Sequence, residues 1–208
     1  MSAAIFAMVD DAALLAGWRA GDRAMGEQLF ERHFATLYRF FGNKVDAADV
    51  GDLVQKTFLA CVEAADTFRG LSSVRTFFFA VARHQLYHHY RARRRAPDLD
   101  VGVTSVADLT PSPSSLVARA EEQRLLGEAF TRIPLELQIA LELRFLEGLR
   151  GPELAQVLDI PEGTVRSRLR RGIEALRAQV EALPGALTER RAALVSVETW
   201  SRDAPPSS

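Results

Sequence analysis

Apolar side chains recur at every third or fourth position along most of this chain, which is the spacing of one face of an α-helix. Runs of β-branched residues with alternating polarity are scarce, so the pattern predicts an all-α protein. In the first half, Asp22, Asp46 and Ser72 precede apolar-periodic stretches and are expected to be helix N-caps. The predicted helices of this half span 11–20, 22–42, 47–65 and 73–95.

The helical pattern stops at residues 96–116, whose sequence is APDLDVGVTSVADLTPSPSSL. Three prolines, three aspartates and no basic residue are typical of a flexible linker. After it, helices are expected at 115–131, 134–147, 151–158 and 161–181, with a weaker pattern at 187–200. The chain is therefore predicted to be two small helical domains joined by a flexible linker. The predicted divisions are a first domain at 11–95, the linker at 96–116, a second domain at 117–182 and a C-terminal extension at 183–208.

The predicted helix 47–65 separates its apolar and polar positions cleanly. Its inward face is expected to hold Val50, Leu53, Val54, Thr57, Phe58 and Cys61, and its outward face Asp49, Asp52, Gln55, Lys56 and Glu63. Cys61 is the single cysteine of the chain, so an internal disulfide and a cysteine-based zinc site are excluded. We expect this thiol to be a small apolar core group.

Two short helices separated by a tight turn are predicted at 151–158 and 161–181, with Pro161 at a first helical position. This is a helix-turn-helix, whose second helix enters the major groove of DNA. The buried stripe of that second helix is expected to be Val165, Leu169, Ile173 and Leu176. The positions that face the groove are expected to be Glu162, Gly163, Thr164, Arg166, Ser167 and Arg170. Arg168 and Arg171, on the opposite flank, are also DNA-binding candidates.

Basic charge is concentrated in two places, although the 208-residue chain has 26 basic and 27 acidic residues and a formal charge of -1. Residues 83–95 hold five arginines and no acid, and residues 160–177 hold another five arginines. Local rather than net charge governs the nearby field, so this focusing indicates a polyanionic partner. The alternative is a solvated helix face, but such faces usually interleave glutamates, and Glu174 is the only acid between Thr164 and Arg177.

The sequence lacks the signals of several other function classes. No run approaches the roughly 18 uncharged apolar residues of a membrane span, and the N-terminus lacks a secretory signal pattern, so we expect a cytoplasmic protein without membrane insertion. Phosphate-binding loops, nucleophile elbows and HExxH motifs are missing, so no catalytic residue and no enzymatic activity are expected. His84, His88 and His89 cluster, but residues 83–95 offer no carboxylate and many arginines, so no metal and no cofactor is expected.

Two stretches resemble the two conserved regions of one family, in the family's order. The run RIPLELQIALELRFLEGLRGPELAQVLDIPEGTVRSRLRRGIEALR resembles the C-terminal conserved region of the extracytoplasmic-function (ECF) sigma factors, which belong to the sigma-70 family of bacterial RNA polymerase. DLVQKTFLACVEAADTF and SSVRTFFFAVARHQLYHHYRARRR resemble the other conserved region. The resemblance spans about residues 11–182, linker position included.

The resemblance implies a dissociable subunit that directs core RNA polymerase to specific promoters and promotes DNA opening. The first domain is expected to bind the clamp helices of the largest subunit and the -10 element. The second is expected to bind the flap of the second subunit and the -35 element. An anti-sigma factor is a further expected partner. The polymerase contacts implied by the resemblance are Asp52, Gln55, Lys56 and Leu59.

Promoter opening needs groups that neutralise phosphates and stack on unpaired bases. Helical phase places Arg83, His84 and Tyr87 on the outside of the fourth helix. The family holds an extruded -10 base in the loop that corresponds here to Phe68 through Ser73. The -10 candidates are Phe68, Arg69, Ser72, Arg83, His84, Tyr87, His88, Arg91, Arg94 and Arg95.

Some positions depart from the family pattern: Phe77 stands at a usual Trp, His84 at a usual Asn and Lys56 at a commonly acidic site.

The alternative function is a helix-turn-helix transcriptional regulator that binds DNA through the second domain, without a polymerase-subunit role. The first half of the chain discriminates between the sigma factor and this regulator. A sensor or dimerisation module has no need for the motif DLVQKTF followed by a helix end that is basic and free of acidic residues. Beyond the family pattern, a short docking helix is expected from Leu187, Leu194, Val197 and Trp200.

Overall fold

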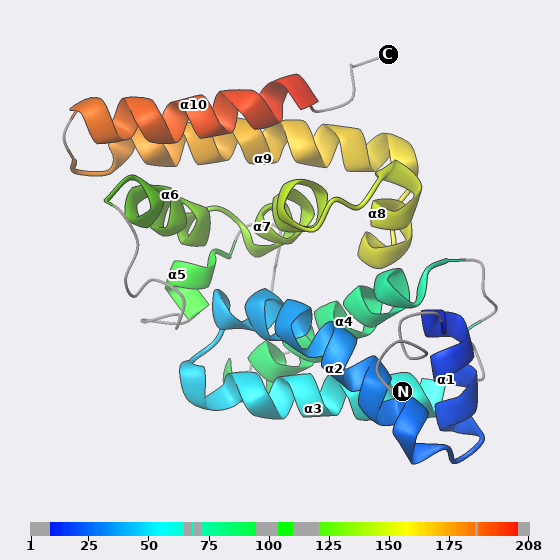
Figure 1. Cartoon of the computed structure of the whole chain (residues 1–208). Helices are drawn as coiled ribbons and strands as arrows, with labels where there is room; N and C mark the ends of the chain where they lie inside the picture. Colours follow the sequence, from blue (N-terminus) through cyan, green and yellow to red (C-terminus); the bar gives the residue numbers. More distant parts are fainter. Residues whose placement is uncertain are drawn as a thin grey trace, which may run out of the picture.

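The computed structural model describes residues 9–64, 68, 72–94, 104–109, 121–185 and 187–203. Within these residues the chain is helical, and the isolated β-bridge between Ser105 and Pro134 is their one element of β structure. The predicted all-α class is confirmed. The helices of the first half lie on one side of the molecule and those of the second half on the other, where the last two helices lie over the helices that precede them in that half (Figure 1).

The first domain is a four-helix unit built by successive packing of α1 on α2, α2 on α3 and α3 on α4. Its helices are α1 (Asp11–Arg19), α2 (Arg23–Gly42), α3 (Ala47–Glu63) and α4 (Val74–Arg94). Each begins and ends within two residues of its predicted bounds, because the apolar periodicity marks the extent of each helix. The inward face predicted for α3 is confirmed in full: Val50, Leu53, Val54, Thr57, Phe58 and Cys61 are buried. Burial raises the pKa of the Cys61 thiol, in keeping with its core position.

The predicted N-caps of the first domain have different outcomes. Asp22 caps α2, since its carboxylate accepts from Ala24 N at 3.0 Å and Met25 N at 3.2 Å. Asp46 occupies the N-cap position of α3, but its carboxylate pairs with Arg93 at 2.7 Å instead of bonding to the helix. The prediction for Ser72 is wrong by one residue, because the Ser73 hydroxyl accepts from Thr76 N at 3.1 Å and α4 starts at Val74.

The second domain packs its helices around α9, which contacts every other long helix of this half. Its elements are α6 (Glu121–Arg132), α7 (Leu135–Leu141), the π-helical turn η3 (Glu142–Leu146), α8 (Gly151–Leu158), α9 (Glu162–Ala182) and α10 (Leu187–Asp203). The single helix predicted at 134–147 is therefore an α-helix that widens into a π turn. Gly172 of α9 allows close approach to α7, because a Cβ at this position would lie 3.0 Å from Leu141 Cγ.

Part of the predicted linker is structured. Residues 106–109 form the short helix α5 (Val106–Leu109), with Val106 fully buried, and Leu135 N donates to Thr104 O at 2.9 Å. The sequence analysis did not predict this short helix, because Pro and Ser residues dominate the composition of the predicted linker around it. The predicted linker residues 96–103 and 110–116 lie outside the described residues.

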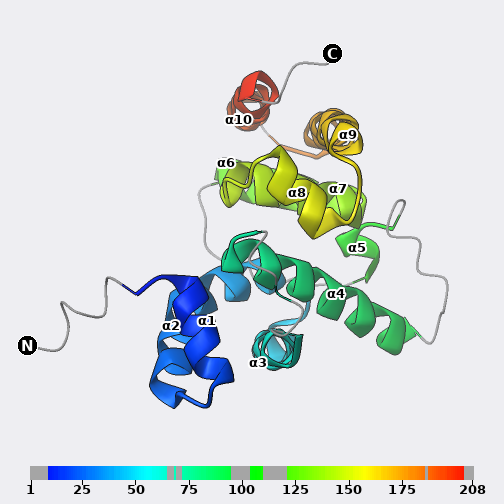
Figure 2. The same ribbon diagram turned by 90° about the vertical axis from the view of Figure 1, so that its right-hand side faces the viewer.

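Helix α10 lies along α9 and also contacts α6 (Figures 1 and 2). Ala193 and Val197 are fully buried, and the Trp200 ring stacks on Phe145 with centroids 5.1 Å apart. Of the apolar side predicted for this helix, Leu194, Val197 and Trp200 therefore pack on the second domain of the same chain, and the side chain of Leu187 lies outside the described residues.

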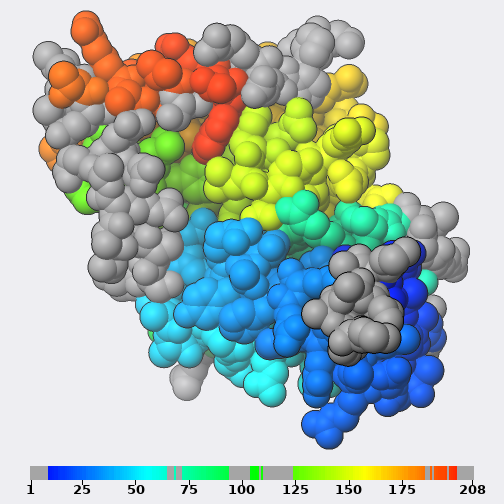
Figure 3. All heavy atoms as spheres, in the orientation of Figure 1, coloured from blue at the N-terminus to red at the C-terminus, as the bar shows by residue number. Residues whose placement is uncertain are grey.

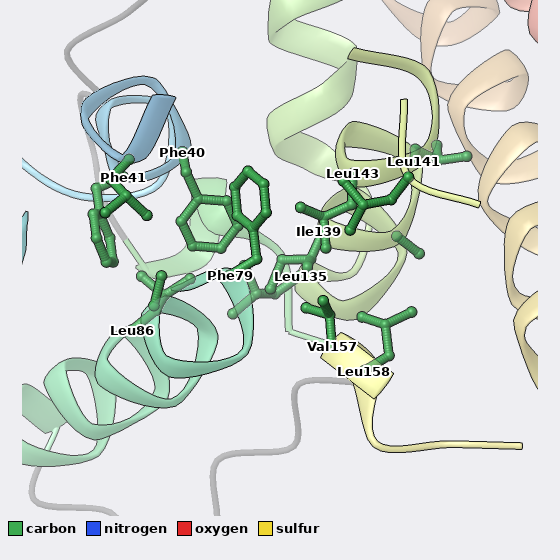
Figure 4. Packing of buried hydrophobic residues seen from close by; sticks show 14 of the residues in the cluster. Phe40, Phe41, Phe79, Leu86, Leu135, Ile139, Leu141, Leu143, Val157 and Leu158 are labelled. Carbon is green, nitrogen blue, oxygen red and sulfur yellow. The ribbon is translucent and has the colours of Figure 1, made fainter. Parts of the chain in front are cut away.

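The two domains contact each other directly. Helix α4 of the first domain lies against α8 of the second (Figure 2), and the two halves meet along a continuous surface in Figure 3. Buried apolar side chains of both halves belong to one cluster, in which Phe40 and Phe79 face Leu135 and Ile139 (Figure 4). Sequence periodicity predicted two cores, whereas the structure joins them.

Candidate nucleic-acid and protein interfaces

Helices α8 and α9 form the predicted helix-turn-helix. The turn between them needs a left-handed residue, which is Asp159 with φ 53° and ψ 52°, and Ile160 N donates to Ala155 O at 3.1 Å to close it. Asp tolerates this conformation better than most non-glycine residues. Pro161 is the N-cap of α9 rather than its first helical residue, so that prediction is off by one position.

The second helix of this motif, α9, presents a polar face at its N-terminal end. The predicted stripe of Val165, Leu169, Ile173 and Leu176 is buried. On the other side Arg166, Ser167 and Arg170 are exposed, as are Glu162 and Gly163, while Thr164 is half-buried. Arg170 makes only a 3.9 Å contact with Glu174, and both side chains are two-thirds exposed. This polar face of α9 is therefore exposed to solvent.

The other flank of α9 is engaged within the domain. Arg168 pairs with Glu136 of α7 at 2.9 Å and is 11% exposed, and Arg171 lies 3.8 Å from the same carboxylate. Of these two predicted DNA-binding arginines, Arg168 is therefore held against α7, whereas the Arg171 side chain is 56% exposed and its contact with Glu136 is long. Arg166 and Arg170 remain on the open face.

Helix α4 carries the basic segment predicted to meet the -10 element. His84 is exposed, as predicted, and the -10 candidates His88 and Arg91 are exposed as well, whereas Arg83, which was also predicted to lie outside, is half-buried. The prediction that Tyr87 lies outside is wrong, because Tyr87 is only 8% exposed. Its hydroxyl accepts from Arg83 Nε at 3.3 Å, and the Arg83 guanidinium lies 4.9 Å from its ring centroid. Arg83 in turn donates to Val157 O of α8 at 3.2 Å, so the second domain contributes to this burial, which periodicity within α4 did not reveal.

The imidazole rings of His84 and His88 meet edge to face, with centroids 4.5 Å apart. Partial burial and the neighbouring His88, Arg91 and Arg83 lower the pKa of His84 below its ordinary value. The lowered pKa favours the neutral form of this ring. Within the described part of the chain, no group of three or more His, Cys, Asp or Glu side chains has the arrangement of a metal site.

The predicted -10 loop is described at three of its residues, Phe68, Ser72 and Ser73. The half-buried Phe68 ring lies 5.2 Å from the ring of Phe77, which stands at the family's usual Trp position. Arg69 and Arg95 lie outside the described residues, as does the side chain of Arg94. The two aromatic rings thus meet at the start of α4, next to its basic face.

The outward face of α3 holds the predicted polymerase contacts. Asp52, Gln55, Lys56 and Leu59 are all exposed. The Asp52 carboxylate and Lys56 ammonium pair at 2.6 Å, with both side chains 58% exposed, and Leu59 is 59% exposed. The four predicted contact residues are therefore all accessible on the surface.

An aromatic row on α2 was not predicted to be functional. Phe30, Phe34 and Tyr38 are each more than a third exposed, and neighbouring rings of the row lie 5.1 Å and 5.6 Å apart. Phe30 also lies 4.6 Å from Phe58 of α3, the residue before Leu59. The i, i+4, i+8 spacing of the row was the available signal, but periodicity alone reads it as core.

Sequence reasoning also missed the ionic contacts between the two domains. Lys44, one of two lysines in the chain, is fully buried and pairs with Glu142 of the second domain. Glu147 accepts from Arg39 at 3.3 Å and also from Arg75. These contacts join residues 72 to 108 positions apart, and no local pattern marks them.

Known families match both halves of the chain. The family described as "Sigma-70 region 2" matches residues 29–96, and the family described as "Sigma-70, region 4" matches residues 123–176. The first match covers α2 to α4 and the second covers the helix-turn-helix. A regulator that uses only its second domain, the alternative considered from the sequence, does not account for the first match.

Curated relatives share this organisation. The chain is 29% identical over 182 residues to the ECF RNA polymerase sigma-E factor of Escherichia coli K12, covering 83% of this chain and 95% of the relative. The protein of the same description from Haemophilus influenzae is 28% identical over 184 residues, covering 83% of this chain and 96% of the relative.

Two solved structures have a similar fold. CnrH in complex with the cytosolic domain of CnrY has a TM-score of 0.60 at 22% identity, covering 84% of this chain and 99% of that chain. The sigma factor RpoE of Bartonella quintana, in complex with the anti-sigma factor NepR, has a TM-score of 0.59 at 20% identity, covering 74% of this chain and 96% of that chain.

Proposed function

Because this chain belongs to the ECF sigma factors of the sigma-70 family, a non-enzymatic subunit of RNA polymerase, we propose which of its surfaces meet polymerase and which meet the promoter. The observation that carries the assignment is the presence of region 2 and region 4 in one chain and in that order. Each region has a task of its own in transcription initiation.

The first domain, residues 11–95, is proposed to bind core polymerase through the outward face of α3. Asp52, Gln55, Lys56 and Leu59 form this surface, and their exposure supports the assignment. We add Phe30, Phe34 and Tyr38 of α2, because exposed aromatic rings beside a charged rim are typical of protein interfaces.

The same domain is proposed to hold the unpaired -10 strand on α4. The exposed His84, His88 and Arg91 supply contacts to phosphates, and Arg83 joins them once it leaves Val157. The Phe68 and Phe77 rings are proposed to stack on a base, with Ser72 at the edge of that site. Arg69, Arg94 and Arg95 complete the proposed phosphate contacts. Tyr87, buried in this conformation, becomes available to a base only if Arg83 moves.

The second domain, residues 117–182, is proposed to read the -35 element with the N-terminal half of α9. Arg166 and Arg170 are the proposed base readers, since an exposed guanidinium can donate two hydrogen bonds to a guanine edge. Glu162, Gly163, Thr164 and Ser167 line the approach to the groove. Arg168 and Arg171 are proposed to position the helix through Glu136.

Residues 96–116 are proposed to connect the two domains, and 183–208 to extend the second one. The site of action is proposed to be the cytoplasm, where core polymerase works. No helix of the described residues combines the length and apolarity that a bilayer span requires. An anti-sigma factor is a further proposed partner, because the Bartonella sigma factor of similar fold was solved with one.

The proposed polymerase surface is tested by binding of the full chain to purified core polymerase. We expect Asp52→Ala and Gln55→Ala each to weaken binding about tenfold, the value of one charge-assisted contact of about 1.5 kcal/mol. Glu63→Gln, on the outward face of the same helix, is the matched control and is expected to bind as the unchanged chain does. Equal affinities for all three variants would remove α3 from the interface.

A further inference from the structure

Helix α10 is a segment of the second domain to which the proposed function assigns no binding task. The match to sigma-70 region 4 ends at residue 176, so α10 lies entirely outside it. Among the described side chains of α10, Ala193 and Val197 are the buried ones, whereas α9 buries six. Arg190 Nη1 donates to Glu181 O at 3.4 Å, which is close to the limit of a hydrogen bond. This helix is therefore attached to its domain by a small, mainly apolar contact.

The surface under α10 is an apolar face of the second domain. Helix α10 lies on α6 and α9 together (Figures 1 and 2), and its Trp200 ring contacts two phenylalanines there. The Trp200 and Phe145 rings are stacked at 5.1 Å with an interplanar angle of 1°, and the Phe130 ring of α6 meets Trp200 edge to face at 6.2 Å. Leu146, the residue after Phe145, is 58% exposed. Removal of α10 would expose the sides of both phenylalanine rings that Trp200 now covers.

The residues that α10 uses for this contact have the spacing of a helix that docks through one face. Ala193, Leu194, Val197 and Trp200 lie at i, i+1, i+4 and i+7, and all four pack on the core. Val195, on the opposite side of the helix, is 58% exposed. An amphipathic helix with small and aliphatic anchors followed by an aromatic one is therefore the kind of ligand that this face accepts.

The other faces of the second domain already have contacts or tasks. The N-terminal half of α9 is proposed to read DNA, and α7 and α8 lie against the first domain (Figures 2 and 4). Two promoter elements can be read at a fixed spacing only if polymerase holds both domains. A protein that holds the second domain while α9 reads DNA is left with the face of α6 and α9 on which α10 lies.

We propose that core polymerase holds the second domain by this face, through an apolar helix of its own, and that α10 is a built-in competitor that must first leave. The proposal rests on the proposed function, in which both domains act on the promoter together with polymerase. Competition within the chain lowers the apparent affinity for polymerase by the fraction of molecules in which α10 leaves the face open. Helix α10 thus weakens polymerase binding without contacting either α3 or the proposed DNA face.

The chain offers a matched pair of substitutions on α10, and neither alters the covered face. Val197→Asp places a carboxylate in the buried contact and is expected to detach α10, whereas Val195→Asp makes the same change at an exposed position. Detachment should shift the fluorescence of Trp200 to longer wavelength, and the other tryptophan, Trp18, lies in the first domain of both proteins. Circular dichroism should lose no more than the helix content of the 17 residues of α10.

Binding to purified core polymerase then tests the competition in the full chain. We expect Val197→Asp to bind about tenfold more tightly than Val195→Asp, which corresponds to a face that α10 leaves open about a tenth of the time. A synthetic peptide of residues 187–203 should bind Val197→Asp but not Val195→Asp, and in excess it should cancel the gain in polymerase affinity. If Val197→Asp keeps α10 docked or loses further helix, Trp200→Ala replaces it in both measurements, because this change removes the stacked ring and adds no charge.

Three outcomes would count against the account, and they differ. Equal, measurable polymerase affinities for the detached variant and Val195→Asp would overturn the competition. Failure of the peptide to bind the detached variant would show that the face does not accept a separate helix, which also overturns it. Absence of polymerase binding by every chain, the unchanged one included, would instead contradict the proposed function, and this inference with it.

Discussion

At the scale of single residues, arginines of similar sequence context have different environments. Arg166 and Arg170 are exposed, Arg168 is held by Glu136, and Arg83 lies between a tyrosine ring and a backbone carbonyl. The sequence indicated a basic helix face, but it did not indicate which guanidinium groups are already paired. That information depends on Glu136 and Val157, which lie on other helices.

The exposed pair on α9 leads to a prediction about promoter recognition. We expect Arg166→Ala and Arg170→Ala each to lower affinity for a preferred -35 element by about 1–3 kcal/mol per lost base contact, with a smaller loss for mismatched elements. Arg177→Ala removes the same charge from the exposed face further along α9 and serves as the control. Fluorescence anisotropy with a panel of duplexes measures the difference. An equal loss on every duplex would mean that these arginines contact phosphates only.

At the scale of helices, the sequence was most informative where one helix has one apolar partner. The buried faces of α3 and α9 follow the predicted stripes residue by residue, because each stripe packs within its own domain. The outward face of α4 was predicted less well, and the burial of Lys44, which follows α2, was not predicted. Tyr87 and Lys44 are both buried beside the second domain. Periodicity predicts which positions of a helix are apolar, but it does not predict which helix of another domain packs against its polar positions.

The contact between α7 and α9 gives a prediction at this scale. Gly172→Ala is expected to destabilise the second domain by about 1–3 kcal/mol, because the added Cβ would meet Leu141. Gly51→Ala on α3 is the control and is expected to add about 0.5–1 kcal/mol, since a Cβ there meets nothing within 4 Å and alanine favours a helix. Urea unfolding followed by circular dichroism gives both values. Destabilisation of equal size at the two positions would contradict the close packing of α7 on α9.

At the scale of the whole molecule, the order of two helical domains could be predicted from the sequence and their contact could not. The family motifs fall within α3, α4 and α7 through α9. Local sequence patterns were therefore sufficient to predict region 2 in the first domain and region 4 in the second. The pairing of Glu147 with Arg39 and Arg75 joins distant parts of the chain, and it makes the free protein a closed molecule.

The most direct test of the central claim, that this chain directs core polymerase to promoters and opens them, is strand opening at a promoter selected from genomic DNA. With 2-aminopurine in the -10 element, we expect fluorescence to rise only when core polymerase and this chain are both present. At a chain concentration near the Kd for core polymerase, the rise should be reduced with Asp52→Ala and with Arg166→Ala. A flat signal with both proteins on every selected promoter, or an equal rise with core polymerase alone, would contradict the account.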